Sequence, residues 1–225
     1  MDLTPGENVK KQTSVATPMS NIILHPTYFP NISHFVAMAK ADNIVFEVED
    51  NYQKQTYRNR TYIYGANGKL ALNIPIKHSH NNRQLFKDVK IANDTKWQSL
   101  HWKSLQSAYR TSPFFEYFED DLAPLFHSKQ DYILDFNFKC LTVIFECLQT
   151  NLNYLTSKSY KLEFSEGLDF RFLVNARKEK EIPFTPYTQV FTNKYAFINN
   201  LSILDLLFNE GTNAVEYLES QNLGL

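Results

Sequence analysis

The segment between residues 49 and 63 concentrates side chains that could bind a charged ligand. It contains two acids, three bases, two asparagines and three tyrosines, just after an apolar run. Arg58 and Arg60 are two residues apart, so in an extended segment both side chains point to the same side. Two guanidinium groups placed there could hold one phosphate or carboxylate through several charge-assisted hydrogen bonds. We therefore expect a small-molecule binding site formed by Lys54, Arg58, Asn59 and Arg60, with Tyr28, Asn51 and Tyr52 orienting the ligand.

Three further residues, His25, Glu49 and His101, are the candidates for catalysis. His25 follows an apolar run and precedes a proline, so a stiff backbone holds a ring that could be a general base or a structural hydrogen-bonding group. Glu49 could act as a general base or hold a cation, and it could equally pair with the neighbouring arginines, as could Asp50. His101 lies on the apolar face of a predicted helix, where core packing is the alternative to a place in the site.

Other kinds of site find less support in the sequence. His78 and His80 alternate correctly for two metal ligands, but a tetrahedral site needs a third and no other His or Cys lies nearby, so no metal is expected. Cys140 and Cys147 are two helical turns apart, about 10 Å, which is too far for a disulfide. An apolar helix also does not activate a thiol. Glycine-rich phosphate-binding motifs are absent, and the sequence identifies no cofactor.

A strand-helix-strand unit should position the polar segments. Residues 21–24 form a short apolar run that ends in a turn bounded by prolines, as expected of a buried strand. Asn31 can cap a helix whose apolar residues recur at helical spacing, and a second strand follows at residues 44–46. Ligands collect at the carboxyl ends of parallel strands. Residues 25–30 and 49–60 should therefore meet at one edge of a sheet.

The remainder predicts an α/β fold with a parallel or mixed sheet and a helix-rich C-terminal half. A hairpin is predicted from residues 62–64 to 70–76, and a further strand at 86–91. From about residue 95 helical spacing dominates. The predicted helices lie between 95 and 112, at 114–126 with an early end at Pro124, at 132–148, before Gly211 with Asn200 or Ser202 as cap, and at 212–218. Residues 154–182 fit no single element.

Bulk properties limit the domain organisation and the class of partner. Residues 1–18 are polar and aperiodic, so we expect a disordered leader, followed by one domain over residues 19–225. A net charge of −1 without a basic patch argues against nucleic-acid binding. No apolar run is long enough for a membrane span, and no secretory pattern begins the chain, which predicts a cytoplasmic protein. The oligomeric state stays open.

Four ordered blocks of the chain resemble the WbqC-like family of bacterial proteins. Residues 25–30 are similar to its Gln-Pro-x-Tyr-Leu-Pro turn, with His in place of Gln. Residues 48–60 resemble its block of acids followed by Trp-Arg-Asn-Arg, with Val48 and Tyr57 as departures. The third block is a helix with Trp, His, Leu and Tyr at every fourth position followed by Pro-x-Phe, matched at 97–115. The fourth is a C-terminal Asn-Leu-Ser-Ile-Leu-Asp-Leu-Leu-Phe-Asn-x-Gly block, matched at 200–211.

The resemblance implies a transferase that modifies a sugar or nucleotide sugar in bacterial cell-surface polysaccharide biosynthesis, such as that of O-antigen. The group transferred would be an amino acid or another acyl group, and the substrate a sugar phosphate or nucleotide sugar. Val48 stands where an acid is usual, which argues against a mechanism that needs paired carboxylates. The alternative is a non-catalytic protein that uses the same pocket to bind a metabolite or to assemble with a partner.

Overall fold

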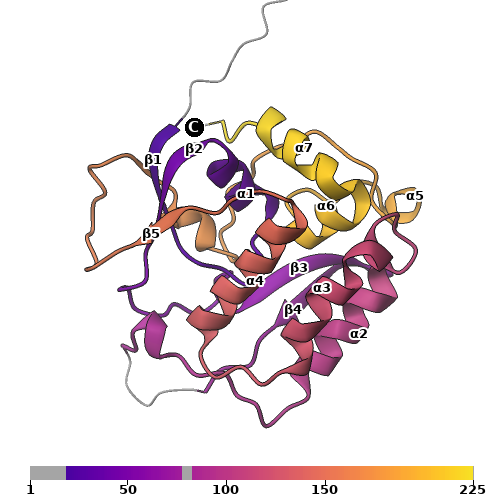
Figure 1. Ribbon diagram of the computed structural model, residues 1–225, viewed down its shortest axis with the longest axis horizontal. Coiled ribbons are helices and arrows are strands. Elements are labelled where there is room, and N and C mark those ends of the chain that lie inside the picture. Colours follow the sequence, from indigo (N-terminus) through magenta and orange to yellow (C-terminus); the bar gives the residue numbers. More distant parts are fainter. Residues whose placement is uncertain (1–18, 78–82, 225) are drawn as a thin grey trace, which may run out of the picture.

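The computed structural model describes residues 19–77 and 83–224, so the predicted leader at 1–18 lies outside the described residues. A four-stranded sheet of order β5-β2-β1-β6 has only parallel pairings (Figure 1). Helix α1 connects β1 to β2, which confirms the strand-helix-strand unit and the α/β class. The bounds are β1 Met19–Leu24, α1 Ile32–Ala39, β2 Ala41–Phe46, β5 Tyr154–Thr156 and β6 Leu168–Asp169.

The first three elements form where the sequence predicts them because their apolar side chains are buried. Ile22 and Leu24 of β1 have no exposed surface, and Leu24 pairs in register with Phe46 of β2. Asn31 caps α1, since its side-chain oxygen accepts a hydrogen bond from the backbone N–H of His34 at 3.2 Å. The turn between β1 and α1 is thereby fixed at both ends.

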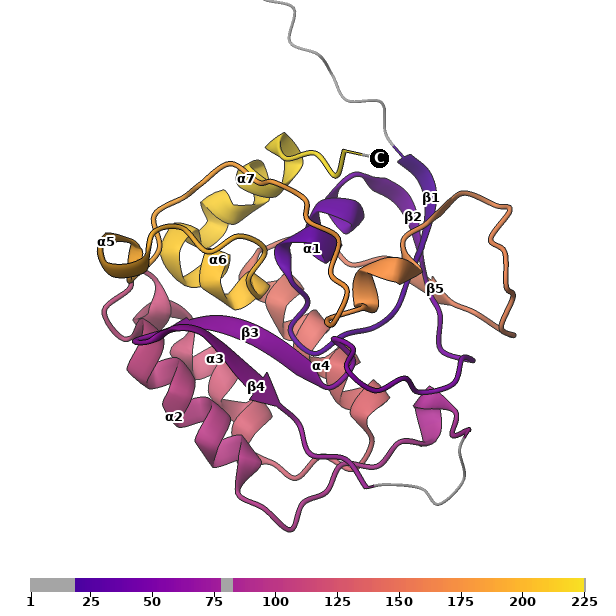
Figure 2. The ribbon, with the colours of Figure 1, turned by 180° about the vertical axis from the view of Figure 1, so that it is seen from behind.

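The predicted hairpin is also present. Strands β3, Arg60–Gly65, and β4, Gly68–Asn73, pair in antiparallel register through a two-residue loop. Gly68 has a φ of 97°, which favours glycine at the end of such a tight turn. The hairpin forms a second sheet and lies alongside α2 in the reverse view (Figure 2).

Helices make up most of the C-terminal half, as predicted. None of the described helices is long and apolar enough to cross a membrane. The α-helices are α2 Trp97–Tyr109, α3 Phe115–His127, α4 Ile133–Cys147, α5 Thr192–Tyr195, α6 Ile203–Glu210 and α7 Ala214–Ser220. Single turns of 3₁₀ helix are η1 Phe86–Asp88, η2 Arg171–Val174 and η3 Gly211–Asn213.

Of the two caps proposed for α6, Ser202 has that role. Its hydroxyl accepts a hydrogen bond from the backbone N–H of Leu204. Asn200 instead serves α1, because its side-chain oxygen accepts from the N–H of Ser33 at 2.8 Å. Gly211, with a φ of 59°, ends α6 as predicted. The C-terminal block thus closes the N-terminal end of a helix far away in the chain.

Two local predictions are wrong. The strand expected at 86–91 is the 3₁₀ turn η1 followed by isolated bridges, one of which joins Lys90 to Tyr132. Phe86 and Val89 are both fully buried, and the turn brings residues three apart to the same side. Pro124 does not shorten α3, which continues to His127. A proline in the last turn removes one backbone hydrogen bond, and the buried side chains around it offset that loss.

A buried polar group in the C-terminal half joins α6 to α2. Asp205 has no exposed surface, and its carboxylate accepts hydrogen bonds from Tyr109 Oη at 2.7 Å, Tyr187 Oη at 2.5 Å and Gln189 Nε2 at 2.8 Å. The Tyr109 hydroxyl also accepts from the backbone N–H of Tyr64. We refer to Asp205, Tyr109, Tyr187 and Gln189 as the Asp205 network. It fixes the position of α6 against α2 and β3.

Candidate functional site

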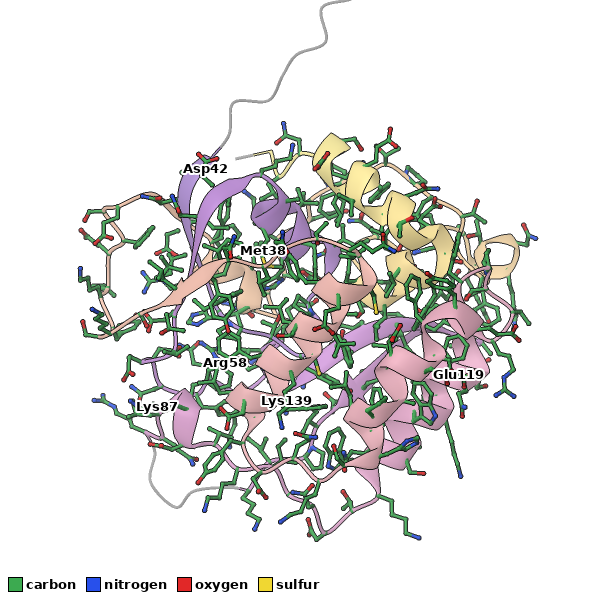
Figure 3. All side chains as sticks on the ribbon, viewed as in Figure 1. Met38, Asp42, Arg58, Lys87, Glu119 and Lys139 are labelled. Atoms are coloured by element: carbon green, nitrogen blue, oxygen red, sulfur yellow. The ribbon has the colours of Figure 1, made fainter. Side chains whose placement is uncertain are left out.

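Three polar side chains from separate segments meet beyond the carboxyl ends of β1 and β2. His25 follows β1, Asp50 lies just after β2, and Arg58 lies in the turn before β3. Arg58 Nη2 donates to Asp50 Oδ2 and lies 3.1 Å from Nε2 and 3.2 Å from Nδ1 of His25. We refer to His25, Asp50 and Arg58 as the Arg58 cluster. In Figure 3 Arg58 lies within the body, whereas Lys87 lies at its rim.

Backbone hydrogen bonds hold these segments side by side. The N–H of Tyr28 donates to the carbonyl of Tyr57 at 3.0 Å, and the N–H of Tyr57 donates to the carbonyl of Val174 at 2.8 Å. Asn137 of α4 has no exposed surface, and its amide donates to the carbonyl of Arg58 at 2.9 Å. The expectation that residues 25–30 and 49–60 meet at one edge of the sheet is therefore confirmed.

Burial controls the charge of the cluster. Desolvation, together with the nearby Arg58 guanidinium, lowers the pKa of His25 well below its usual value, so the ring is neutral near pH 7. One ring nitrogen is hydrogen-bonded to the backbone of Glu47, and the other can accept from Arg58. Desolvation raises the pKa of Asp50 to about 6, although Arg58 opposes that shift. Desolvation also lowers the pKa of Arg58, and Asp50 opposes it.

Buried polar atoms without a hydrogen-bond partner gather around this cluster. Asp50 Oδ1 and both Nε and Nη1 of Arg58 have none among the described residues. Native proteins leave few such atoms, and those that occur often belong to functional sites. The other atoms of this kind come from the same two segments and from helices α1 and α4: Thr27 Oγ1, His34 Nε2, Arg60 Nε and Asn137 Oδ1.

A cavity of about 300 Å³ lies over one face of the four-stranded sheet, near the carboxyl ends of β1 and β2. Ile23, Val45 and Leu155, which are paired in register, line it, and none of its lining residues belongs to the Arg58 cluster. Glu47, which follows β2 directly, lines it and is only 1% exposed. Glu47 Oε1 accepts from Ser157 Oγ at 2.7 Å and from the N–H of Glu49 at 2.9 Å. Glu47 Oε2 lies 3.7 Å from Nη1 of Arg171. We refer to this space as the sheet-edge cavity, and Glu47 joins it to the Arg58 cluster.

The side chains of Arg58 and Arg60 have separate contacts and do not form one anion-binding site. Arg58 lies in a turn and has no exposed surface. The prediction of an extended segment at this point is therefore wrong. Arg60 opens β3, and its Nη1 lies 3.4 Å from the hydroxyl of Tyr62. The chain turns at residues 57–59, and this turn separates the contacts of the two side chains.

The other expected binding residues lie around the hairpin and the loop before it. Asn59 donates through Nδ2 to the carbonyl of Ile74 at 3.0 Å. Asn51 and Lys54 are exposed. Tyr52 is half-buried, and burial raises its pKa although the charges of Arg58 and Arg60 oppose that shift.

Two of the expected catalytic residues have partners outside the cluster. Glu49 Oε2 accepts from Lys87 Nζ at 2.6 Å, close to the surface. His101 is hydrogen-bonded to the backbone of Asn73, and its Nδ1 lies 3.0 Å from the hydroxyl of Tyr28. Burial lowers the pKa of His101 to about 4, so the ring stays neutral near pH 7. These contacts give His101 and Tyr28 a packing role between α2, the hairpin and the first turn.

Metal ligands and thiols do not add to the site. Among the described residues, no group of three or more His, Cys, Asp or Glu side chains is placed to hold a metal ion. His78 and His80 lie outside those residues. Cys140 and Cys147 are free and buried, and burial raises the pKa of both thiols.

Sequence reasoning missed several residues of the site. Glu47 follows a predicted strand directly, and that position was the available signal for it. Ser157 and Arg171 come from the segment that fitted no predicted element, and Asn137 comes from a predicted helix in which only the apolar side chains were singled out. Arg171 forms a bidentate pair with Asp169 and donates from Nη1 to the carbonyl of Lys161 at 2.6 Å. It thereby anchors the loop that forms one wall of the cavity.

Comparison with known proteins agrees with the first three of the four blocks described above. The model of the WbqC-like protein family matches residues 25–180, a range that includes the Arg58 cluster and every residue that lines the sheet-edge cavity except Ile23. A relative from Mycobacterium tuberculosis (strain ATCC 25618 / H37Rv), named uncharacterized protein Rv1507c, is 25% identical over 225 residues, which cover 87% of this chain and 96% of the relative. No solved structure matches the chain. The chain belongs to the WbqC-like protein family.

Proposed function

We propose that this protein is a transferase that binds a sugar phosphate or nucleotide sugar in the sheet-edge cavity and modifies the sugar. The observation that carries the proposal is the buried carboxylate of Glu47, which lines a cavity at the carboxyl ends of parallel strands. That edge is where open α/β sheets bind ligands. A carboxylate at such a position accepts hydrogen bonds from sugar hydroxyls and can take a proton from one of them.

The contacts of the expected catalytic residues favour Glu47 for proton transfer. Both ring nitrogens of His25 are occupied, by the backbone of Glu47 and by Arg58. A proton added to His25 would also meet the positive charge of Arg58. His25 and Arg58 therefore act as positioning residues that fix the strand end carrying Glu47. This role agrees with the Gln that the family has at position 25, because an amide can also donate and accept.

The anionic part of the substrate would contact the rim of the cavity. Arg58 is fully buried and Arg171 already has partners at all three guanidinium nitrogens. Lys158 and Lys161 line the same cavity and are exposed. They supply the charge that a phosphate requires, and flexible ammonium groups suit a ligand that must enter and leave.

Calorimetry with a panel of nucleotide sugars and sugar phosphates tests binding, and mass spectrometry with acyl and aminoacyl donors tests transfer. We expect Glu47→Gln to lower product formation by about 100-fold or more while affinity changes only severalfold, because loss of a general base removes that much rate. Glu163→Gln is the matched control, since Glu163 lines the same cavity but is exposed. Its product formation should stay near that of the wild type. A panel in which nothing binds contradicts the proposal.

The alternative is a non-catalytic protein that binds a metabolite in the same cavity. One observation favours it: the same Arg58 nitrogen, Nη2, is hydrogen-bonded to the neutral ring of His25 and to the carboxylate of Asp50. The ring of His25 is then not free to exchange protons with a ligand, and only Oδ1 of Asp50 is without a partner. Tight binding of one compound without any product by mass would support this reading over the transferase.

A further inference from the structure

Large exposed apolar side chains concentrate in one segment of the described chain. Leu155 is 69% exposed and Leu162 is 79% exposed. Among the described leucines outside this segment, only Leu100, at 65%, is similarly exposed. Contiguous apolar surface of this kind marks interaction sites in soluble proteins. The segment spans residues 154–172 and contributes Tyr154, Leu155, Tyr160, Leu162, Leu168 and Phe172.

The same segment includes an edge strand with a free side. Strand β5 pairs with β2 alone among the described strands, and all three of its residues are exposed. The loop at 157–167 then projects from the body in both views (Figures 1 and 2). Parallel sheets are normally covered on both faces. An edge strand with unpaired N–H and C=O groups readily pairs with a strand of another chain.

Charges on this segment indicate what kind of chain it pairs with. The loop carries Lys158, Lys161, Glu163 and Glu166, two of each sign, and Lys161 lies 3.4 Å from Glu166. A surface that meets its own copy across a two-fold axis has to be self-complementary. Balanced charges meet that requirement, whereas a strongly charged partner would call for charge of one sign. The net charge of −1 also gives two copies little reason to repel.

We propose that β5 and the loop at 157–167 form the interface of a two-fold symmetric dimer of this chain. The two β5 strands pair antiparallel about Leu155, the central residue of the strand, and the two four-stranded sheets become one. The side chains of Tyr154 and Leu155 are then covered by those of the partner copy, whereas Leu168 of β6 lies at the opposite edge of the sheet and stays outside this contact. Leu155, Lys158 and Lys161 also line the sheet-edge cavity, so the dimer contact lies directly beside the proposed ligand site. The dimer itself does not depend on the proposed function, and molar mass measures it without a ligand.

Molar mass from light scattering tests the dimer. The full chain at micromolar concentration should have twice the mass of one chain. Leu155→Glu and Leu162→Glu should each give a single chain, because the first brings like charges together across the axis and the second places a charge in the apolar part of the proposed interface. Leu100→Glu is the matched control, since Leu100 is 65% exposed on α2, and it should stay dimeric. A wild type that is monomeric at every concentration, or a dimer that survives both substitutions, overturns the proposal.

A disulfide trap tests the strand pairing itself. In an antiparallel pair, directly opposed residues have Cα atoms about 4.5–5.5 Å apart, a distance that a disulfide can span. Leu155→Cys should therefore form a cross-linked dimer under mild oxidation, and Leu100→Cys should not. Both natural cysteines are buried and do not compete. A dimer whose Leu155→Cys variant fails to cross-link overturns the β5 pairing.

Discussion

Two of the buried carboxylates among the described residues, Asp50 and Asp205, differ in one respect. Burial raises the pKa of each to about 6. Asp205 accepts three hydrogen bonds, and none of the atoms of its network is without a partner. Asp50 has one partner, Arg58, and leaves Oδ1 unpaired, as Arg58 leaves two nitrogens unpaired. Asp205 and Asp50 therefore have a similarly raised pKa, although all hydrogen-bonding atoms of Asp205 have partners and one oxygen of Asp50 has none.

The difference separates a structural group from a candidate site. A fully satisfied buried network makes the fold rigid and specifies one arrangement of the core. A partly satisfied network costs stability, and proteins keep such groups mainly where they function. We infer that the Asp205 network serves the fold and that the Arg58 cluster serves the ligand. Each experiment below changes a residue of either the Asp205 network or the Arg58 cluster.

The largest effect is expected from Asp205→Ala. This change leaves three buried donors unpaired, at about 1–3 kcal/mol each, so the free energy of unfolding should fall by at least about 3 kcal/mol. Urea denaturation followed by circular dichroism measures it. Asp205→Asn keeps an acceptor and should cost less. A loss below about 1 kcal/mol for the alanine variant would place Asp205 outside the structural role assigned to it.

The next effect concerns pH. The folded pKa of Asp205, about 6, lies above the value of about 3.9 expected in the unfolded chain. Its contribution to stability is therefore complete below about pH 4 and is lost as the pH rises through 6. Relative to Asp205→Asn, the wild type should lose about 2–3 kcal/mol of unfolding free energy between about pH 4 and pH 7. Buried histidines contribute in the opposite direction but equally in both proteins, so the difference isolates Asp205.

An effect on both function and fold is expected from Asp50→Asn. The amide keeps the shape of the side chain but removes the charge that holds the buried Arg58. Product formation should fall about tenfold, equivalent to about 1.4 kcal/mol, and the urea midpoint should also fall because Arg58 loses its buried charge partner. Kinetics and denaturation of the same preparation measure both. An unchanged rate with a large loss of stability would make the Arg58 cluster a structural group like the Asp205 network.

The smallest effect is expected from His25→Gln. Glutamine can accept from Arg58 and donate to the backbone of Glu47, so it replaces both contacts of the ring. Activity should stay within about threefold and stability within about 0.5 kcal/mol of the wild type. His25→Leu lacks both contacts and is the comparison variant. A large loss of activity for the glutamine variant, together with a changed pH profile, would show that His25 transfers protons.

Local signals account for the parts of the fold that the sequence predicts correctly. Strand β1, the cap at Asn31, the hairpin and the end of α6 at Gly211 each depend on residues close together in the chain. The meeting of residues 25–30 with 49–60 also follows from local order, because a strand-helix-strand unit brings both strand ends to one edge. The expected binding segment was therefore placed at the correct edge.

Long-range contacts account for what the sequence does not reveal. Arg58 is buried because Asn137 and Val174, from distant segments, hydrogen-bond to its backbone and that of its neighbour. Strands β5 and β6 have too few residues to produce a recognisable pattern, and each forms only because a partner strand is already present. Glu47 lines a cavity because Ser157 and Arg171, from a distant segment, lie against it and form another wall of that cavity.

The place of β5 in the sheet also affects how the chain folds during synthesis. Ser157, which follows β5, lies 110 residues after Glu47, which follows β2, and three helices are made in between. A ribosome adds about 5–20 residues per second, so the nascent β2 edge stays open on the order of ten seconds before its neighbour emerges. During that interval the growing polypeptide offers an open strand to other newly made chains, which makes this stretch a natural client for chaperones.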